Sequence, residues 1–235
     1  MAADLAASGL FDANYYLLNN PDVAEAGADP LAHFCRDGWR EDRFPNPYFH
    51  PHWYRHTHRL PPDVPPLWHY LSQGEAAGHM PCRYFDPVWY AAVHALPATT
   101  SPLADYLARR RGQAVAPIPL FDPRYYCAAH AGQVRPGRDA FLHYLTVGAA
   151  QDWRPVPWFD AAAYRRSWMA GATERVPLLH WIAALGGRPW AALADATLLR
   201  LDTRHLDAGC DQAARGISPD SRELRLRKNA SSNAG

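Results

Sequence analysis

Phenylalanine recurs at nearly constant intervals along this chain, and each of these phenylalanines is followed five residues later by a tyrosine. The intervals are 38, 36, 36 and 38 residues. The pairs are Phe11 and Tyr16, Phe49 and Tyr54, Phe85 and Tyr90, Phe121 and Tyr126, and Phe159 and Tyr164. Self-similarity at a period of this length is typical of repeat architectures, in which each repeat is one supersecondary unit. The chain is therefore expected to be built from tandem units of one kind.

Each pair marks the start of a helix. An acidic residue follows the phenylalanine at Asp12, Asp86, Asp122 and Asp160, and His50 takes this place in the second unit. Aspartate is a favoured N-cap, and Pro51, Pro87 and Pro123 then occupy the first helical position, where the missing N–H costs nothing. The phenylalanine before the cap and the tyrosine at the fourth helical position form a hydrophobic staple.

A second helix is predicted about 20 residues further on, from apolar residues spaced by three. They are Leu31 and Phe34, Leu67 and Tyr70, Leu103 and Tyr106, Phe141 and Tyr144, and Leu178 and Trp181. Prolines open these helices at Pro30, Pro66, Pro102 and Pro177, with Asp29 and Ser101 as caps. The residue before the aromatic is His33, His69, Asp105, His143 or His180. Because aspartate replaces histidine once, we expect these side chains to hydrogen-bond the adjacent loop rather than to catalyse a reaction.

Glycine follows the second helix at Gly38, Gly74 and Gly148, where a left-handed residue would end it. Arg110 holds this position in the third unit, and in the fifth unit the glycine comes one residue later, at Gly186. A proline-rich stretch then returns the chain to the next phenylalanine. Helices this short are marginal alone, so we expect neighbouring units to stabilise one another.

The predicted fold is all-α, with about five tandem helix-turn-helix repeats of 36–38 residues in a compact or solenoid-like array. We call the repeats segments 1 to 5. They span about 10–47, 48–83, 84–119, 120–157 and 158–190. Residues 1–9 form a lead-in. Residues 191–235 are expected to hold a short helix near 190–201 and a polar tail, poorly ordered over about its last 15 residues.

Composition narrows the functional classes. A formal net charge of +1 gives no general attraction to nucleic acid. No run approaches the roughly 18 apolar residues of a membrane span, and the first residues do not resemble a signal peptide, so we expect a cytoplasmic protein. The cysteines, Cys35, Cys82, Cys127 and Cys210, are far apart, which favours reduced thiols over a disulfide framework or metal site.

Segment 1 carries a more specific signal, FDANYY, NPDV, GADPLAHF and GWREDRFPNP. It resembles a helical repeat found in bacterial proteins of exopolysaccharide and cell-envelope biosynthesis, often beside glycosyltransferase domains. Segments 2 to 5 keep the spacing of the repeated aromatic residues but lack NPDV and parts of the GWREDRFPNP stretch. The resemblance implies a protein partner in polysaccharide assembly, such as a glycosyltransferase or another envelope-assembly component. The resemblance assigns no catalytic residue to this chain.

Three groups of side chains are candidates for chemistry. His50, His52, His56 and His58 lie close in sequence, and His52 with His56 could share a metal on one helix face. Arg109, Arg110 and Arg111 could bind an anion or an acidic glycan, or could complement the carbonyls at a helix end. Trp39, Trp153 and Trp190 could stack on sugars or anchor a partner, although packing between repeats is the simpler interpretation.

The chain lacks the sequence motifs of serine hydrolases, zinc proteases, P-loop enzymes and dinucleotide-binding enzymes, and no cofactor is expected. The function predicted first is a non-catalytic scaffold that binds protein. The alternatives are a glycan-binding or anion-binding module that uses arginine and aromatic residues, and a metal-dependent enzyme centred on His50 to His58.

Overall fold

The structure is a computed structural model, and it describes residues 2–185. Within that range the chain forms twelve α-helices and no β-strand, as an all-α fold requires. The helices are α1 (Ala2–Ser8), α2 (Ala13–Asn19), α3 (Pro21–Glu25), α4 (Pro30–His33), α5 (Pro51–Thr57), α6 (Pro66–His69), α7 (Pro87–Val93), α8 (Pro102–Arg109), α9 (Pro123–Ala129), α10 (Ala140–Thr146), α11 (Ala161–Trp168) and α12 (Pro177–Ala184). Short π-helical turns, η1 (Phe34–Gly38) and η2 (Tyr70–Gly74), extend α4 and α6, and a 3-10 turn, η3 (Gly148–Gln151), follows α10.

The predicted helix starts are confirmed. The carboxylates of Asp12, Asp86, Asp122 and Asp160 each accept hydrogen bonds from backbone N–H groups in the first turn that follows. Asp29 and Ser101 cap α4 and α8 in the same way. His50 occupies the equivalent position before α5, but its side chain makes no capping bond. The lead-in, residues 1–9, contains helix α1, whose Leu5 is buried.

Each segment holds its own small aromatic core. The staple phenylalanine and tyrosine lie with ring centroids 5.2 to 5.6 Å apart in all five segments. The same phenylalanine also contacts the aromatic residue of the second helix, at 5.3 to 5.9 Å. In the first four segments the tyrosine and that second aromatic meet edge to face, at interplanar angles of 84 to 87°. These geometries are favourable for aromatic pairs. All three kinds of ring contact lie within one segment and are not contacts between neighbouring units.

The prediction that glycine ends the second helix in a left-handed conformation is wrong. Gly38, Gly74 and Gly148 do not have positive φ angles. Their role is to leave room, because a Cβ at each of them would overlap the hydroxyl of the staple tyrosine in the same segment. Gly186, the equivalent expected in segment 5, lies outside the described residues.

The proline-rich return brings each segment back to its own beginning. The backbone N–H of Asp12 donates to the carbonyl of Pro45 (2.9 Å), and His50 donates to Pro81 (3.1 Å). The same bond joins Asp86 to Pro117 and Asp122 to Pro155. In each of these four segments a backbone hydrogen bond therefore joins the N-cap residue of the first helix to the proline-rich stretch at the end of the segment.

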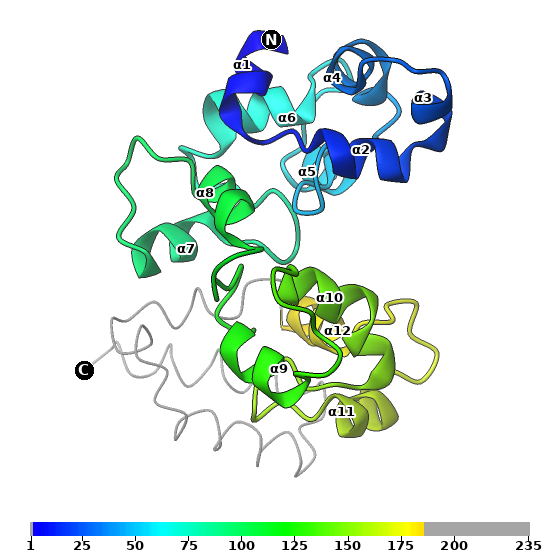
Figure 1. The fold of residues 1–235 in the computed structure, drawn as a ribbon, viewed down its shortest axis with the longest axis vertical. Coiled ribbons are helices and arrows are strands. Elements are labelled where there is room, and N and C mark those ends of the chain that lie inside the picture. Colours follow the sequence, from blue (N-terminus) through cyan, green and yellow to red (C-terminus); the bar gives the residue numbers. More distant parts are fainter. Residues whose placement is uncertain (1, 186–235) are drawn as a thin grey trace, which may run out of the picture.

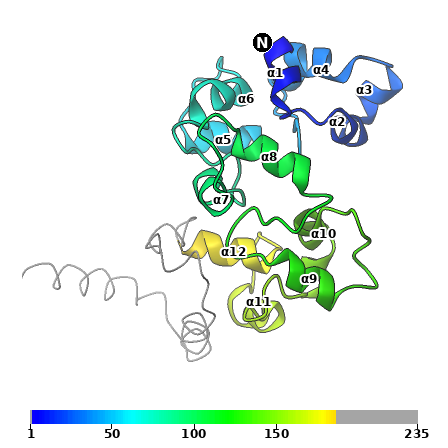
Figure 2. The ribbon, with the colours of Figure 1, turned by 60° about the vertical axis from the view of Figure 1, so that its left-hand side comes forward.

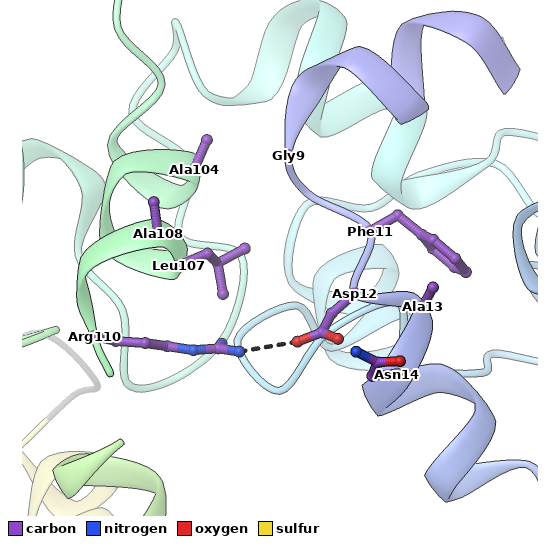
Figure 3. A pocket seen from close by; sticks show the side chains of 9 residues that line it. All are labelled: Gly9, Phe11, Asp12, Ala13, Asn14, Ala104, Leu107, Ala108 and Arg110. Atoms are coloured by element: carbon purple, nitrogen blue, oxygen red, sulfur yellow. Dashed lines mark hydrogen bonds and ion pairs between the residues drawn. The ribbon is translucent and has the colours of Figure 1, made fainter. Parts of the chain in front are cut away.

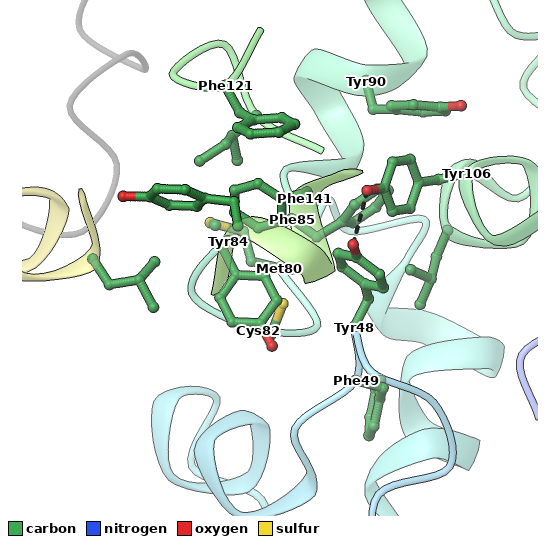
Figure 4. Close-up of a cluster of buried hydrophobic side chains, with 14 of the residues drawn as sticks. Tyr48, Phe49, Met80, Cys82, Tyr84, Phe85, Tyr90, Tyr106, Phe121 and Phe141 are labelled. Atoms are coloured by element: carbon green, nitrogen blue, oxygen red, sulfur yellow. Dashed lines mark hydrogen bonds between the residues drawn. The ribbon is translucent and has the colours of Figure 1, made fainter. Parts of the chain in front are cut away.

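Segments that are not neighbours in sequence also meet. Arg110 of segment 3 pairs with Asp12 of segment 1 at 3.0 Å. Tyr48 of segment 2 donates to Asp139 of segment 4 at 2.8 Å. Figures 1 and 2 show α1 to α8 in one half of the molecule and α9 to α12 in the other. A cluster that contains Tyr48, Tyr84, Tyr106 and Phe141 lies where the halves meet (Figure 4).

Several sequence predictions fall beyond residue 185. The short helix near 190–201, the polar tail, Trp190 and Cys210 all lie outside the described residues. None of the helices within residues 2–185 is both long enough and apolar enough to cross a membrane.

The close approach at glycine gives a test of the segment core. Gly74→Ala should lower the free energy of unfolding by about 1 to 3 kcal/mol, because the new methyl overlaps the Tyr54 hydroxyl. In a Tyr54→Phe background the same change should cost less, since the overlapping oxygen is gone. Gly112→Ala is the matched control, because its Cβ would meet no atom within 4 Å. Urea denaturation measures all four variants. An equal cost of Gly74→Ala in both backgrounds would contradict this explanation.

Candidate functional site

A hydrogen bond between the two helices recurs in all five segments. The staple tyrosine hydroxyl bonds the residue that precedes the second aromatic. The pairs are Tyr16 and His33 (2.9 Å), Tyr54 and His69 (2.9 Å), Tyr90 and Asp105 (2.7 Å), Tyr126 and His143 (2.9 Å), and Tyr164 and His180 (2.9 Å). The histidines use Nδ1. These side chains therefore bond the first helix of their own segment, and the expected bond to the adjacent loop is wrong.

The side chains around this bond differ between segments. In segment 2 the Tyr54 hydroxyl also bonds His79 (3.2 Å), whose ring stacks on His58 at 4.0 Å. In segment 4 an indole takes the place of His79, and Trp153 stacks on His130 at 3.9 Å. Because the surroundings change while the tyrosine bond is kept, the bond serves the fold in every segment.

Burial shapes the electrostatics of this region. It is the main cause that raises the pKa of Tyr16 and of Tyr164 to about 12. It is also the main cause that lowers the pKa of His58 and of His69 below the usual value. At neutral pH these two imidazoles are accordingly held in the neutral form, as hydrogen-bonding rather than charged groups.

The structure does not bring the predicted histidine group together. His50 is half-buried and bonds the Tyr84 hydroxyl through Nε2 (2.6 Å), whereas His52 and His56 are exposed on α5. His58 turns to the carbonyl of Met80 (3.2 Å) and to His79. Among residues 2–185 no group of three or more histidine, cysteine or acidic side chains is arranged to hold a metal ion.

The three consecutive arginines have three different environments. Arg109 pairs with Asp105 at 2.9 Å. Arg110 is buried, with its side chain 3% exposed, and donates to Asp12. Arg111 is 61% exposed and approaches Asp12 at 3.8 Å. Arg110 and Arg111 both approach Asp12, and Arg109 pairs with Asp105, so all three are engaged with carboxylates of this chain and do not form one open anion site.

Arg110 belongs to a buried polar network that links four segments. It lies 3.4 Å from the carboxylate of Asp139, which also accepts from the Tyr48 hydroxyl. Tyr106 donates to Tyr48 at 3.0 Å. Burial raises the pKa of Asp139 above the usual value for an aspartate. The arginine and its two carboxylates lie between segments, where unpaired charges would be costly.

A groove of about 320 Å³ lies between the start of α2 and the outer side of α8. Figure 3 shows Phe11 and Asp12 on one side and Leu107 and Ala108 on the other, with the Asp12–Arg110 ion pair across one end. Its walls are mainly apolar, and the polar groups in its lining are the Asp12–Arg110 ion pair and the side chain of Asn14. This arrangement suits contact with a small apolar group and contains no paired acid and base for catalysis.

Trp39 and Trp153 pack against other side chains of this chain. Trp39 is buried, with Arg40 over its ring at 4.2 Å, and Trp153 is stacked between His130 and the segment core. The ring contacts of Trp153, with Tyr126, His130 and His143, all lie within segment 4, so this tryptophan packs within its repeat rather than between repeats. Cys35, Cys82 and Cys127 are free thiols.

Sequence reasoning missed the groove and the buried network, because both join positions about 100 residues apart. The sequence did contain one signal. Arg110 stands where segments 1, 2 and 4 have glycine, and a different residue at a repeated position indicates that this unit makes a contact there that the others do not.

His50 predicts a pH dependence of stability. Burial is the main cause that lowers its pKa to about 4, so the unfolded chain, with a pKa near 6.5, binds this proton first. The free energy of unfolding should be highest above about pH 6.5 and should fall as the pH drops toward 4. His50→Asn should reduce that slope by up to about 1.4 kcal/mol per pH unit. His52→Asn, at an exposed position, should leave it unchanged. Urea titrations between about pH 7 and 5 measure this, and identical slopes in all three proteins would refute it.

Comparisons with models of protein families, with curated proteins and with solved structures find no match to this chain. The resemblance of segment 1 to an exopolysaccharide-associated repeat is untested by them and stays a prediction.

Proposed function

We propose that this chain is a non-catalytic scaffold that binds another protein, and that its five segments form a compact helical array. The observation that carries the proposal is the recurrent tyrosine bond. Four histidines and Asp105 occupy the same place and make the same contact. A position that accepts either histidine or aspartate with the same partner serves structure, since the two side chains differ in proton-transfer chemistry.

Contacts between segments support a compact array over a linear one. In a linear array each repeat contacts only its neighbours. Here Arg110 joins segment 3 to segment 1, Tyr48 joins segment 2 to segment 4, and Arg83 pairs with Glu174 of segment 5 at 2.8 Å. Such contacts fix the segments relative to one another, which suits a scaffold that presents a defined surface.

The groove between α2 and α8 is the candidate contact surface. Its walls come from segments 1 and 3, so it exists only when the segments are assembled. An apolar groove with one polar end can receive a side chain from a partner protein. The repeat resemblance of segment 1 suggests that the partner belongs to envelope polysaccharide assembly.

Capture of partners from native cells tests the proposal. The tagged full chain should repeatedly retain the same protein, and Ala108→Trp should remove it by filling the groove. Ala128→Trp on α9 is the control, because Ala128 is exposed and does not line the groove. We expect retention at least about tenfold weaker for Ala108→Trp, equivalent to about 1.4 kcal/mol of binding free energy. Equal retention by both variants, or no repeatable partner, would count against the function proposed.

A further inference from the structure

Residues 135–138 form a tight turn ahead of helix α10. The backbone N–H of Arg138 donates to the carbonyl of Arg135 at 3.2 Å, and Gly137 has a φ of +78°. Proline at the second position and a positive-φ glycine at the third are the residues that a type II β-turn demands. The first and fourth Cα atoms of such a turn lie within about 7 Å, so Arg135 and Arg138 are close neighbours. Both are exposed.

The tip of this turn lies against the chain that leaves α8. A Cβ on Gly137 would be 3.8 Å from the carbonyl oxygen of Arg111. The Arg111 side chain is 61% exposed. Two segments of the chain thus contribute exposed guanidinium groups to one region of the surface. We call Arg111, Arg135 and Arg138 the arginine face.

The carboxylates near the arginine face are engaged elsewhere. Within residues 2–185, Arg135 and Arg138 form no ion pair, and Arg111 reaches only Asp12, whose Oδ2 already accepts from Arg110. Asp139, next to Arg138, is buried and bonded to Tyr48. Of these two carboxylates, Asp139 is buried, and Asp12 is shared between Arg110 and Arg111.

We propose that the arginine face binds an acidic peptide segment of a partner protein. The inference rests on the proposed function and names the chemistry of the partner. Guanidinium groups bind carboxylates through paired hydrogen bonds. A sugar chain would favour an aromatic ring for stacking, and the three residues of the arginine face include none. Arg111 approaches Asp12, which lines the groove, at 3.8 Å, so a peptide on the arginine face can also reach an apolar wall.

Fluorescence anisotropy with a labelled peptide that carries a run of glutamates tests the proposal on the full chain. We expect binding at about 20 mM salt that weakens toward about 150 mM, because exposed charges are screened. Arg135→Glu with Arg138→Glu should weaken binding at least about tenfold. Arg166→Glu with Arg175→Glu, at exposed positions in segment 5, makes the same change in net charge and should have a much smaller effect. Unfolding curves for both double variants should match the parent, since these side chains are exposed.

Equal weakening by the two double variants, or no binding at low salt, would overturn the proposal. Tighter binding of a polygalacturonate chain than of the peptide would also overturn it, in favour of an acidic glycan. The outcome is separable from that of the proposed function. If the captured partner is retained by Arg135→Glu with Arg138→Glu, the scaffold function stands while the arginine face is excluded. If no partner is captured, the peptide measurement still decides whether the face binds carboxylates.

Discussion

The tyrosine hydroxyl that joins the two helices of each segment is the contact on which the rest of the structure depends. Each helix in the described part of the chain has only four to eight residues, too few to persist alone. The tyrosine places its ring between the staple phenylalanine and the second aromatic, and its hydroxyl on the second helix. Glycine at Gly38, Gly74 and Gly148 is required because the same hydroxyl occupies the space a Cβ would need.

A second level of organisation arises from one departure at a repeated position. Segment 3 replaces that glycine with Arg110, and the buried guanidinium meets Asp12 of segment 1 and Asp139 of segment 4. Tyr48 and Tyr106 complete the network by hydrogen bonding. A buried charge without partners would be costly, so these residues favour one arrangement of the segments over others. The groove between α2 and α8, and the arginine face beside it, follow from that arrangement.

Much of the local structure was predictable from the sequence. The caps at Asp12, Asp86, Asp122 and Asp160, and the staple contacts, follow from rules that act over a few residues, and all are confirmed. The predicted role of Gly38, Gly74 and Gly148 was wrong. A left-handed helix end and a close approach by a side chain both require glycine, so the sequence alone does not distinguish them. Only the structure separates them.

The candidate sites were harder to predict, because they depend on how distant segments pack. Positions close in sequence, such as His50 and His58 or Arg109 and Arg110, have different partners in the structure. Contacts that define the groove join Asp12 to Arg110, and no periodic pattern encodes that pairing. The turn at 135–138 is visible as RPGR, but its position beside Arg111 is not.

A double-mutant cycle on Tyr126 and His143 tests the central claim most directly. Tyr126→Phe removes only the hydroxyl, His143→Ala removes its partner, and the double variant closes the cycle. If the hydroxyl holds the helices together, the two changes should show a coupling energy of about 0.5 to 1.5 kcal/mol in urea denaturation. The same cycle on Tyr90 and Asp105 should also show coupling, although the partner is an aspartate. Additive effects in both cycles would contradict the account.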